Sequence, residues 1–129
     1  MKNSENPLQL IPDPQREYGS WILGEELLQG RVQEVLNPFE GETLGRILVG
    51  GTEVGEAAVE TAERAFPVWS SLSCSDRGHY LARFARLIEK YQNTLSRLIV
   101  LEQGKPITEA LVVELFAAAD SWRHLARNT

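Results

Sequence analysis

The sequence predicts an α/β chain in which an N-terminal β-hairpin region is followed by about four α-helices. Three observations support this prediction. Residues 18–49 contain short strand-like runs separated by turn residues. After Gly50 and Gly51 the apolar residues recur with the 3.6-residue period of a helix. Glycine and proline then divide the remaining chain into separate helical segments.

Composition restricts the class and location of the protein. The chain has 129 residues, of which 43% are hydrophobic and 24% are charged, and this suits one modest domain. No apolar run approaches the roughly 20 residues that span a bilayer, and the start of the chain lacks the apolar core of a signal peptide. We therefore expect no membrane partner and a cytoplasmic location.

Charge and cysteine content exclude two further features. The net charge is −5, whereas binding to a nucleic-acid backbone relies on clustered Lys and Arg, so no nucleic-acid partner is expected. Cys74 is the single cysteine of the sequence. An internal disulfide is therefore impossible.

The chain is expected to divide into two parts. Residues 1–17 contain Pro7, Pro12 and Pro14, three of the six prolines, and show no sustained period of 2 or 3.6 residues. This composition predicts a flexible N-terminal arm. The periodic segments begin after it and occupy residues 18–129.

A hairpin is predicted within the strand-like region. Residues 31–36 and residues 43–49 are both compatible with β-strands. Between them, Asn37 can hydrogen-bond its own backbone, Pro38 fixes φ, and Gly41 tolerates a positive φ. The two runs are therefore expected to pair across this turn.

The first helix is expected to begin with Thr52 as its cap and to end at Pro67, because proline lacks the backbone N–H that a helix requires. Its apolar residues recur at helical spacing and share one face. They are Val54, Ala58, Ala62, Ala65, Phe66 and Trp69.

Three more helices are predicted from caps and stops. Ser75 or Asp76 is placed to cap the second, Gly104 ends the third, and Thr108 is placed to cap the fourth. Apolar stripes define the inward faces of the second and fourth helices. These stripes contain Leu81, Phe84, Ile88 and Tyr91 in the second helix, and Leu115, Ala119, Trp122 and Ala126 in the fourth.

Motifs for phosphate or metal binding do not occur in the sequence. Residues 50–55 have threonine where a dinucleotide-binding loop needs its second glycine, and residues 104–106 lack the rest of a P-loop. His79 and His124 belong to no metal-binding arrangement. We expect His79 on a helix surface, and His124 beside Asp120, one turn earlier.

Cys74 and Glu102 are the two residues with settings that suggest chemistry. Cys74 lies close to a predicted helix N-terminus and to Arg77, a setting that favours a thiolate, but no base is identifiable nearby. We therefore interpret it as an incidental residue. Glu102 lies at a predicted helix C-terminus, where an exposed salt bridge to Lys105 or an ordinary amphipathic boundary explains it better than a role as an ion ligand.

Several short motifs occur in a recognisable order along the chain. They are Trp21-Ile22-Leu23-Gly24, Asn37-Pro38-Phe39-Glu40-Gly41-Glu42, Ala58-Val59 with Ala62 and Ala65-Phe66, Trp69, Arg77 with Leu81, and Glu102-Gln103-Gly104-Lys105-Pro106. Together they resemble the N-terminal part of the aldehyde dehydrogenase superfamily, whose members oxidise aldehydes to carboxylic acids with NAD or NADP. The resemblance implies that this segment is part of a Rossmann-like coenzyme domain.

The resemblance also implies which sites to expect. The family's coenzyme loop, general-base glutamate and nucleophilic cysteine all follow later than Thr129, so no catalytic residue and no coenzyme are expected for this chain alone. Some members bind a structural monovalent cation through a backbone carbonyl and an acid that correspond to Leu36 and Glu102. A third ligand would follow Thr129, which makes this site incomplete.

Two functional hypotheses from different classes remain open. The chain is a truncated or partial aldehyde dehydrogenase without activity of its own, or it is an interaction module that pairs with a homologous or complementary subunit. The resemblance implies that the helices pack on a sheet formed by later residues. Side chains such as Phe66, Phe84, Leu115 and Trp122 are then not all expected to find partners within this chain, which favours self-association. An enzyme with unrelated chemistry at Cys74 is a third alternative.

Overall fold

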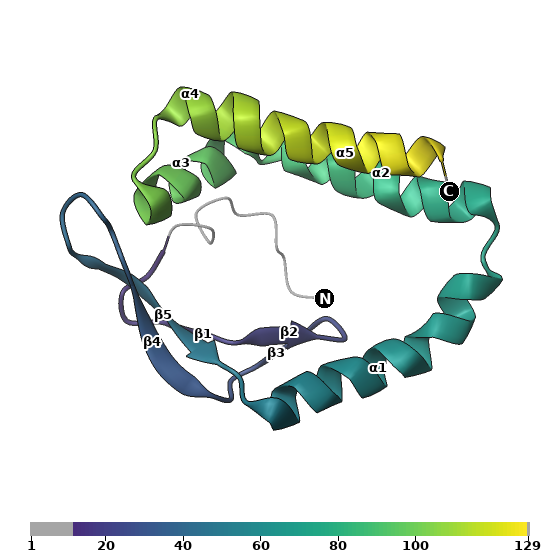
Figure 1. The fold of residues 1–129 in the computed structure, drawn as a ribbon, viewed down its shortest axis with the longest axis horizontal. Helices are drawn as coiled ribbons and strands as arrows, with labels where there is room; N and C mark the ends of the chain where they lie inside the picture. Colours follow the sequence, from purple (N-terminus) through teal and green to yellow (C-terminus); the bar gives the residue numbers. More distant parts are fainter. Residues whose placement is uncertain (1–11, 129) are drawn as a thin grey trace. The chain divides into compact units, whose positions relative to one another are not determined.

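The computed structural model describes residues 12–128, which fall into two compact units, residues 12–71 and residues 72–128. The first unit contains the strands and one long helix, and the second is entirely helical. The predicted order, strands first and helices after, is confirmed (Figure 1). Of the predicted N-terminal arm, residues 1–11 lie outside the described residues.

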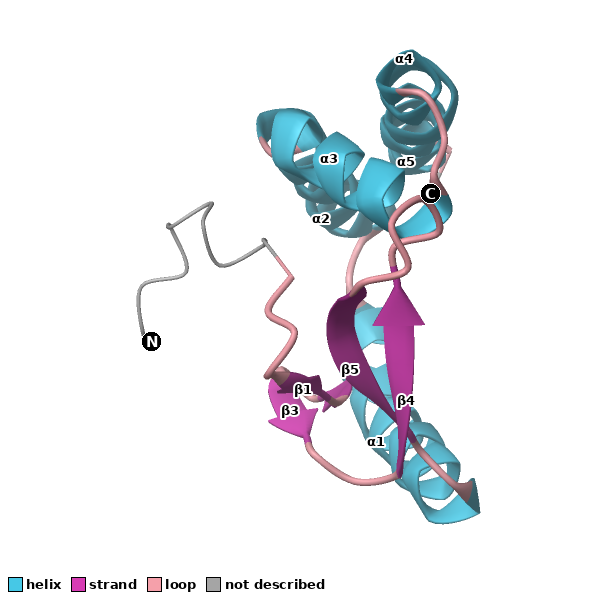
Figure 2. Ribbon diagram, turned by 90° about the vertical axis from the view of Figure 1, so that its left-hand side faces the viewer, coloured by secondary structure: helices cyan, strands magenta, loops and turns pink. Residues whose placement is uncertain are grey.

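The predicted hairpin is present. Strand β4 (Arg31–Leu36) pairs antiparallel with β5 (Thr43–Val49), with a bulge between Val35 and Leu36 (Figure 2). In the turn, the side-chain oxygen Oδ1 of Asn37 accepts the N–H of Phe39 at 3.0 Å. The backbone of Asn37 also bonds to Glu42 and Gly41, and Gly41 has a φ of 74°. Asn37 therefore organises the turn as its position predicts.

Three shorter strands complete the first unit. β1 (Glu17–Tyr18) runs parallel to β5 and extends that sheet in the order β1-β5-β4. β2 (Ser20–Ile22) and β3 (Glu25–Leu27) form a separate antiparallel pair. Leu23 and Gly24 connect them as a two-residue loop, and both have positive φ, 55° and 78°. Such φ values are those of a type I′ turn, whose twist matches that of the two strands.

Helix α1 (Thr52–Ser71) is longer than the sequence predicts. It begins at Thr52 itself, and the prediction that Pro67 ends it is wrong, because Pro67 lies inside the helix. Proline removes one helical hydrogen bond, the one to the carbonyl of Glu63, and at this exposed position water can bond to that carbonyl. The hydroxyl groups of Ser70 and Ser71 donate to carbonyls of the final turn.

The helix face that was predicted to be apolar is mostly exposed in this unit. Val54, near the start of α1, is buried. Further along, Ala62, Phe66 and Trp69 of the predicted face recur together with Val59, which the prediction did not include, at positions i+3, i+7, i+10 and i, and we call these four residues the α1 stripe. Phe66 in this stripe is 64% exposed. The described residues therefore leave most of the stripe accessible to solvent.

In the second unit, α2 (Cys74–Lys90) starts earlier than predicted. Its cap is Ser73, whose Oγ accepts the N–H of Asp76 at 3.1 Å and donates to the Asp76 carboxylate at 2.6 Å. The predicted caps, Ser75 and Asp76, are therefore wrong, because both lie within the first turn. Asp76 acts as the partner of the cap, three residues after it.

The third helix, α3 (Gln92–Gln103), ends as predicted. Gly104 follows it with a φ of 69°, in the left-handed region, and donates its N–H to the carbonyl of Val100 at 2.8 Å. A residue with a side chain would be strained in this conformation, so glycine ends the helix at low cost.

The last helical run is continuous but contains an irregular segment. It consists of α4 (Ile107–Glu109), the π-helical segment η2 (Ala110–Leu115) and α5 (Phe116–Arg127). Its N-cap is Pro106, so the prediction that Thr108 caps it is wrong. Proline suits a helix start because its φ is already helical and the N–H it lacks has no partner there.

The core of the helical unit is built from small residues. Ala85 of α2 and Ala110, Leu115 and Ala119 of the last helical run are buried. α2 and α5 lie side by side in both views (Figures 1 and 2) and make the most extensive contact between helices. Beside the alanines, Phe84 and Trp122 meet edge to face with ring centroids 4.8 Å apart. Three of the four large apolar residues singled out in the sequence therefore find partners within this unit, and they are Phe84, Leu115 and Trp122.

No helix among residues 12–128 combines the length and the apolar character needed to cross a membrane.

Leu23 offers a test of the turn between β2 and β3. It is the one described non-glycine residue with positive φ, and 79% of it is exposed. Asparagine tolerates this conformation better than leucine, so we expect Leu23→Asn to stabilise the protein by roughly 1 kcal/mol, measured as a higher midpoint of thermal unfolding. Leu28→Asn is the matched control, because Leu28 is 60% exposed and has an ordinary φ. An equal rise in both variants would show that reduced surface hydrophobicity, not the turn, is responsible.

Candidate functional site

The two predicted cation ligands lie in different units. Leu36 is the last residue of β4, where the bulge pairs it with Thr43. The next residue, Asn37, is buried and holds the turn. Glu102 lies in the last turn of α3, in the helical unit. Each half of the predicted site is therefore well defined by itself, and the pairing of Leu36 with Glu102 stays a prediction.

Glu102 does not form the predicted salt bridge with Lys105. Among residues 12–128, Lys105 pairs instead with Glu114 of the π-helical segment, and Glu102 has no ion-pair partner. Lys105 directly follows Gly104, the residue that ends α3, and its partner Glu114 belongs to the next helical run. The carboxylate of Glu102 is exposed and accessible.

Cys74 is the first residue of α2 and is exposed. The guanidinium of Arg77 lies beside it, with Nη2 3.5 Å from Sγ, while Nη1 donates to the carbonyl of Leu72 at 2.9 Å. Within residues 12–128 no imidazole or carboxylate hydrogen-bonds to this thiol. A cysteine nucleophile in an enzyme needs a base to activate it, and the interpretation of Cys74 as incidental stays a prediction.

The histidines also lie apart from any catalytic or metal-binding group. The predicted pairing of His124 with Asp120 is wrong, because Asp120 lies 3.4 Å from Arg123, and the His124 ring contacts Asn128 instead. His79 lies on the exposed surface of α2, as predicted. The described part of the chain brings together no group of three or more His, Cys, Asp or Glu residues that could hold a metal ion.

The start of α1 is the place where a pyrophosphate could be expected, since β5 leads through Gly50 and Gly51 into a helix N-terminus. The side chains there oppose such binding. Glu53 lies in the first turn, and a hollow beside it is lined partly by Glu56 and Glu60. These carboxylates repel the negative charge of a dinucleotide. The start of α1 is therefore an unfavourable place for a pyrophosphate.

A structural ion pair in the first unit was missed by the sequence analysis. The Glu26 carboxylate accepts the N–H of Gly19 at 3.0 Å and pairs with Arg16 at 2.8 Å. These contacts lower the pKa of Glu26 below its ordinary value, first through the backbone hydrogen bond and then through Arg16. Arg16 belongs to the part of the chain that was predicted to be an arm, so its partner ten residues away could not be recognised.

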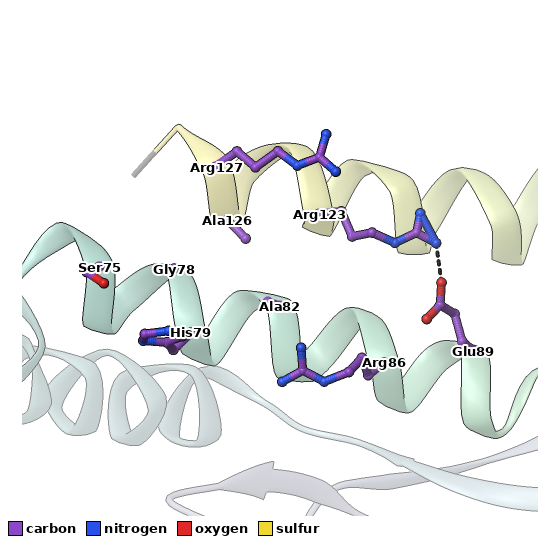
Figure 3. Close-up of a pocket in the computed structure, with 9 residues that line it drawn as sticks. All are labelled: Ser75, Gly78, His79, Ala82, Arg86, Glu89, Arg123, Ala126 and Arg127. Atoms are coloured by element: carbon purple, nitrogen blue, oxygen red, sulfur yellow. Dashed lines mark hydrogen bonds and ion pairs between the residues drawn. The ribbon is translucent and has the colours of Figure 1, made fainter.

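A second missed feature is a groove between α2 and α5, with a volume of about 420 Å³. Figure 3 shows both helices contributing side chains to it. The residues that line it are Ser75, Gly78, His79, Ala82, Arg86, Glu89, Arg123, Ala126 and Arg127. The sequence did not indicate this groove, because the lining residues on α5 are remote in sequence from those on α2.

Comparison with known proteins decides the family. The model of the aldehyde dehydrogenase family matches residues 25–129, which is most of the chain. The chain belongs to the aldehyde dehydrogenase family. The predicted resemblance to this family is therefore confirmed. The predicted α/β fold class is confirmed as well.

Relatives and solved structures agree with this assignment. The NADP(+)-type succinate-semialdehyde dehydrogenase of Escherichia coli is 36% identical over 92 residues, which are 71% of this chain and 18% of that enzyme. The betaine aldehyde dehydrogenase of Vibrio vulnificus is 40% identical over 91 residues, 70% of this chain and 19% of that protein. An NAD+ complex of a Bacillus cereus aldehyde dehydrogenase superposes with a TM-score of 0.84 at 26% identity, covering 96% of this chain and 26% of that one. The chain thus spans about a fifth of the length of its curated relatives.

Glu26 predicts how stability depends on pH. Its pKa is lower in the folded protein, so the ionised carboxylate stabilises the fold at neutral pH, and this contribution is lost as the pH falls below about 4.5. We expect Glu26→Gln to lower the midpoint of urea unfolding at pH 7 and to have a smaller effect at pH 3. Glu25→Gln, at an exposed position of the same strand, is the control and should have little effect at either pH. A Glu26→Gln effect of equal size at both pH values would contradict the assigned role of the charge.

Proposed function

We propose that this chain is a partial aldehyde dehydrogenase, built from the N-terminal segment of the coenzyme domain, and that by itself it does not oxidise aldehydes. The family match over residues 25–129 and the coverage of about a fifth of each curated relative support the first part. The isolated setting of Cys74 supports the second.

The observation that carries the proposal is the exposed α1 stripe. A helix in a folded protein normally buries its apolar stripe against another element. Phe66 is largely exposed in the middle of this stripe, and exposed apolar patches of more than a few hundred Å² mark interfaces or aggregation-prone surfaces. The stripe is therefore suited to a protein surface that these residues do not supply.

A second candidate function uses the same observation. The chain could serve as an interaction module that pairs with a full-length or complementary aldehyde dehydrogenase subunit, or with itself. The α1 stripe favours this candidate too, because it provides an apolar surface on one side of a single helix. The two candidates differ in whether such pairing produces a defined complex of fixed stoichiometry.

We also propose that Leu36 and Glu102 provide two ligands of a monovalent cation site when the rest of an aldehyde dehydrogenase domain is present. Two features support this. The turn held by Asn37 restrains the backbone next to Leu36, and the carboxylate of Glu102 has no ion pair among the described residues. Carbonyl and carboxylate oxygens are suitable ligands for such a hard cation.

Turnover is the first measurement. The 129-residue chain should oxidise no aldehyde with NAD or NADP, because covalent catalysis needs both an activated nucleophile and a base. The assay is reduction of the coenzyme followed by absorbance, with propionaldehyde as a general substrate. Cys74→Ser serves as the control against a contaminating enzyme. Activity that disappears specifically in this variant would refute the interpretation of Cys74 as incidental.

Coenzyme binding is the second measurement. We expect the chain alone to bind NAD weakly or not at all, because the start of α1 is acidic and lacks a dinucleotide-binding loop. Calorimetric titration with NAD checks this directly. Saturable binding near the micromolar range, about −8 kcal/mol, would show that a coenzyme site has been missed.

The third measurement tests whether apolar surface is exposed. The chain should have helical circular dichroism, self-associate and bind a dye specific for apolar surfaces, and Phe66→Ser should reduce both the association and the dye binding. Phe39→Ser is the matched control, since Phe39 is 91% exposed but lies in the hairpin turn, outside the α1 stripe. A cooperative monomer that binds no dye would indicate an autonomous helical module instead.

A further inference from the structure

We propose that the α1 stripe is covered by α2 of a second copy of this chain, with the two helices packed parallel to each other. This pairing rests on the proposed function, in which the α1 stripe is an interaction surface. Helix α2 carries an apolar stripe of its own, Tyr80, Phe84 and Leu87, at positions i, i+4 and i+7, which we call the α2 stripe. These side chains are 57%, 46% and 43% exposed, although Phe84 also packs on Trp122.

The two stripes are bordered by opposite charges. Glu56 and Glu63 lie beside the α1 stripe, and Arg83 and Lys90 lie beside the α2 stripe. All four are exposed, and none of them forms an ion pair among residues 12–128. Each pair is separated by seven residues, so the two charges on α1 have the same spacing along the helix axis as the two on α2.

The position of the charges sets the direction in which the helices run. On α1 each glutamate precedes an apolar residue of the stripe by three positions, as Glu56 precedes Val59. On α2 each basic residue follows an apolar residue by three positions, as Arg83 follows Tyr80. These positions are opposite flanks of a stripe, because a helix completes a turn in about 3.6 residues. Opposite flanks meet when helices pack parallel, as the e and g positions of a parallel coiled coil do.

A parallel pair of α1 and α2 requires two copies of the chain. Helix α1 ends at residue 71 and α2 begins at residue 74, so only two residues connect them. Helices joined by so short a connection run antiparallel when they pack on one another. The two residues cannot lead the chain back along α1, which has 20 residues and is about 30 Å long. Each copy carries both surfaces, so two copies can form the contact without another protein.

The apolar stripes meet when the charges are aligned. With Glu56 beside Arg83 of the other copy, the second pair of charges is aligned as well, because both spacings are seven residues. In this register Val59 lies level with residue 86 of the other copy, between Phe84 and Leu87. An apolar side chain placed between two residues of the facing helix is the arrangement of knobs-into-holes packing. Apolar burial and charge complementarity therefore favour the same register.

Charge reversal tests the pairing. Self-association of the 129-residue chain is measured by sedimentation velocity for two variants, Glu56→Lys with Glu63→Lys and Arg83→Glu with Lys90→Glu. In each variant alone, like charges meet at the contact, so we expect the dissociation constant to rise about tenfold. An equimolar mixture of the two should restore association, because α1 of each variant then meets opposite charges on α2 of the other.

Matched controls separate this contact from the effect of net charge. Glu25→Lys with Glu42→Lys changes the net charge as the α1 variant does, at exposed positions outside α1. Arg31→Glu with Arg97→Glu does the same for the α2 variant, at exposed positions outside α2. We expect both controls to associate like the unmodified chain. Circular dichroism melting of every variant verifies that it is folded.

The outcomes distinguish this pairing from the proposed function. Association that is lost in Phe66→Ser but unchanged by either charge reversal would overturn the pairing with α2 and leave the α1 stripe as an interaction surface. Weakening without restoration in the mixture, or equal weakening in the controls, would also rule out the pairing. A chain that remains monomeric at all concentrations would contradict both the pairing and the use of the α1 stripe for self-association.

Discussion

Close packing of α2 against α5 is the interaction on which the helical unit depends. Ala85 and Ala119 are almost completely buried where the two helices meet, and side chains this small allow a close approach. Larger groups then meet beside the alanines: Phe84 packs on Trp122, and Glu89 pairs with Arg123. Because Glu89 and Arg123 come from helices far apart in sequence, this packing also creates the groove and its uneven charge.

Polar contacts organise the strand unit to a greater extent than they organise the helical unit. Asn37 holds the hairpin turn, and Glu26 joins the backbone of Gly19 to the side chain of Arg16. Its buried apolar residues are few, Leu48 and Val54, while the α1 stripe remains largely accessible. A small core and an exposed stripe together support the proposal that this segment belongs to a larger domain.

Single residues such as glycine and proline predicted some helix ends correctly. The prediction failed where the structure tolerates a lost hydrogen bond, or where burial depends on a neighbouring helix. Gly104 ends α3 because its left-handed conformation depends on that residue alone. Pro67 does not end α1, since one lost hydrogen bond at an exposed position is tolerated within a long helix. The π-helical segment, by contrast, places Ala110 and Leu115 five residues apart, and both are buried. Leu115 belongs to the predicted apolar stripe, whereas the burial of Ala110 depends on neighbouring helices and lies outside that stripe.

By itself the sequence determined the order of strands and helices, the hairpin turn and the family, because each rests on short motifs and on periodicity along the chain. Only the tertiary structure decided which charges are paired. Lys105 bonds to Glu114 rather than Glu102, and Arg123 is shared by Glu89 and Asp120. An ion pair depends on the distance between side chains, and for Arg123 and Glu89 that distance is set by the packing of α5 on α2, two helices far apart in sequence.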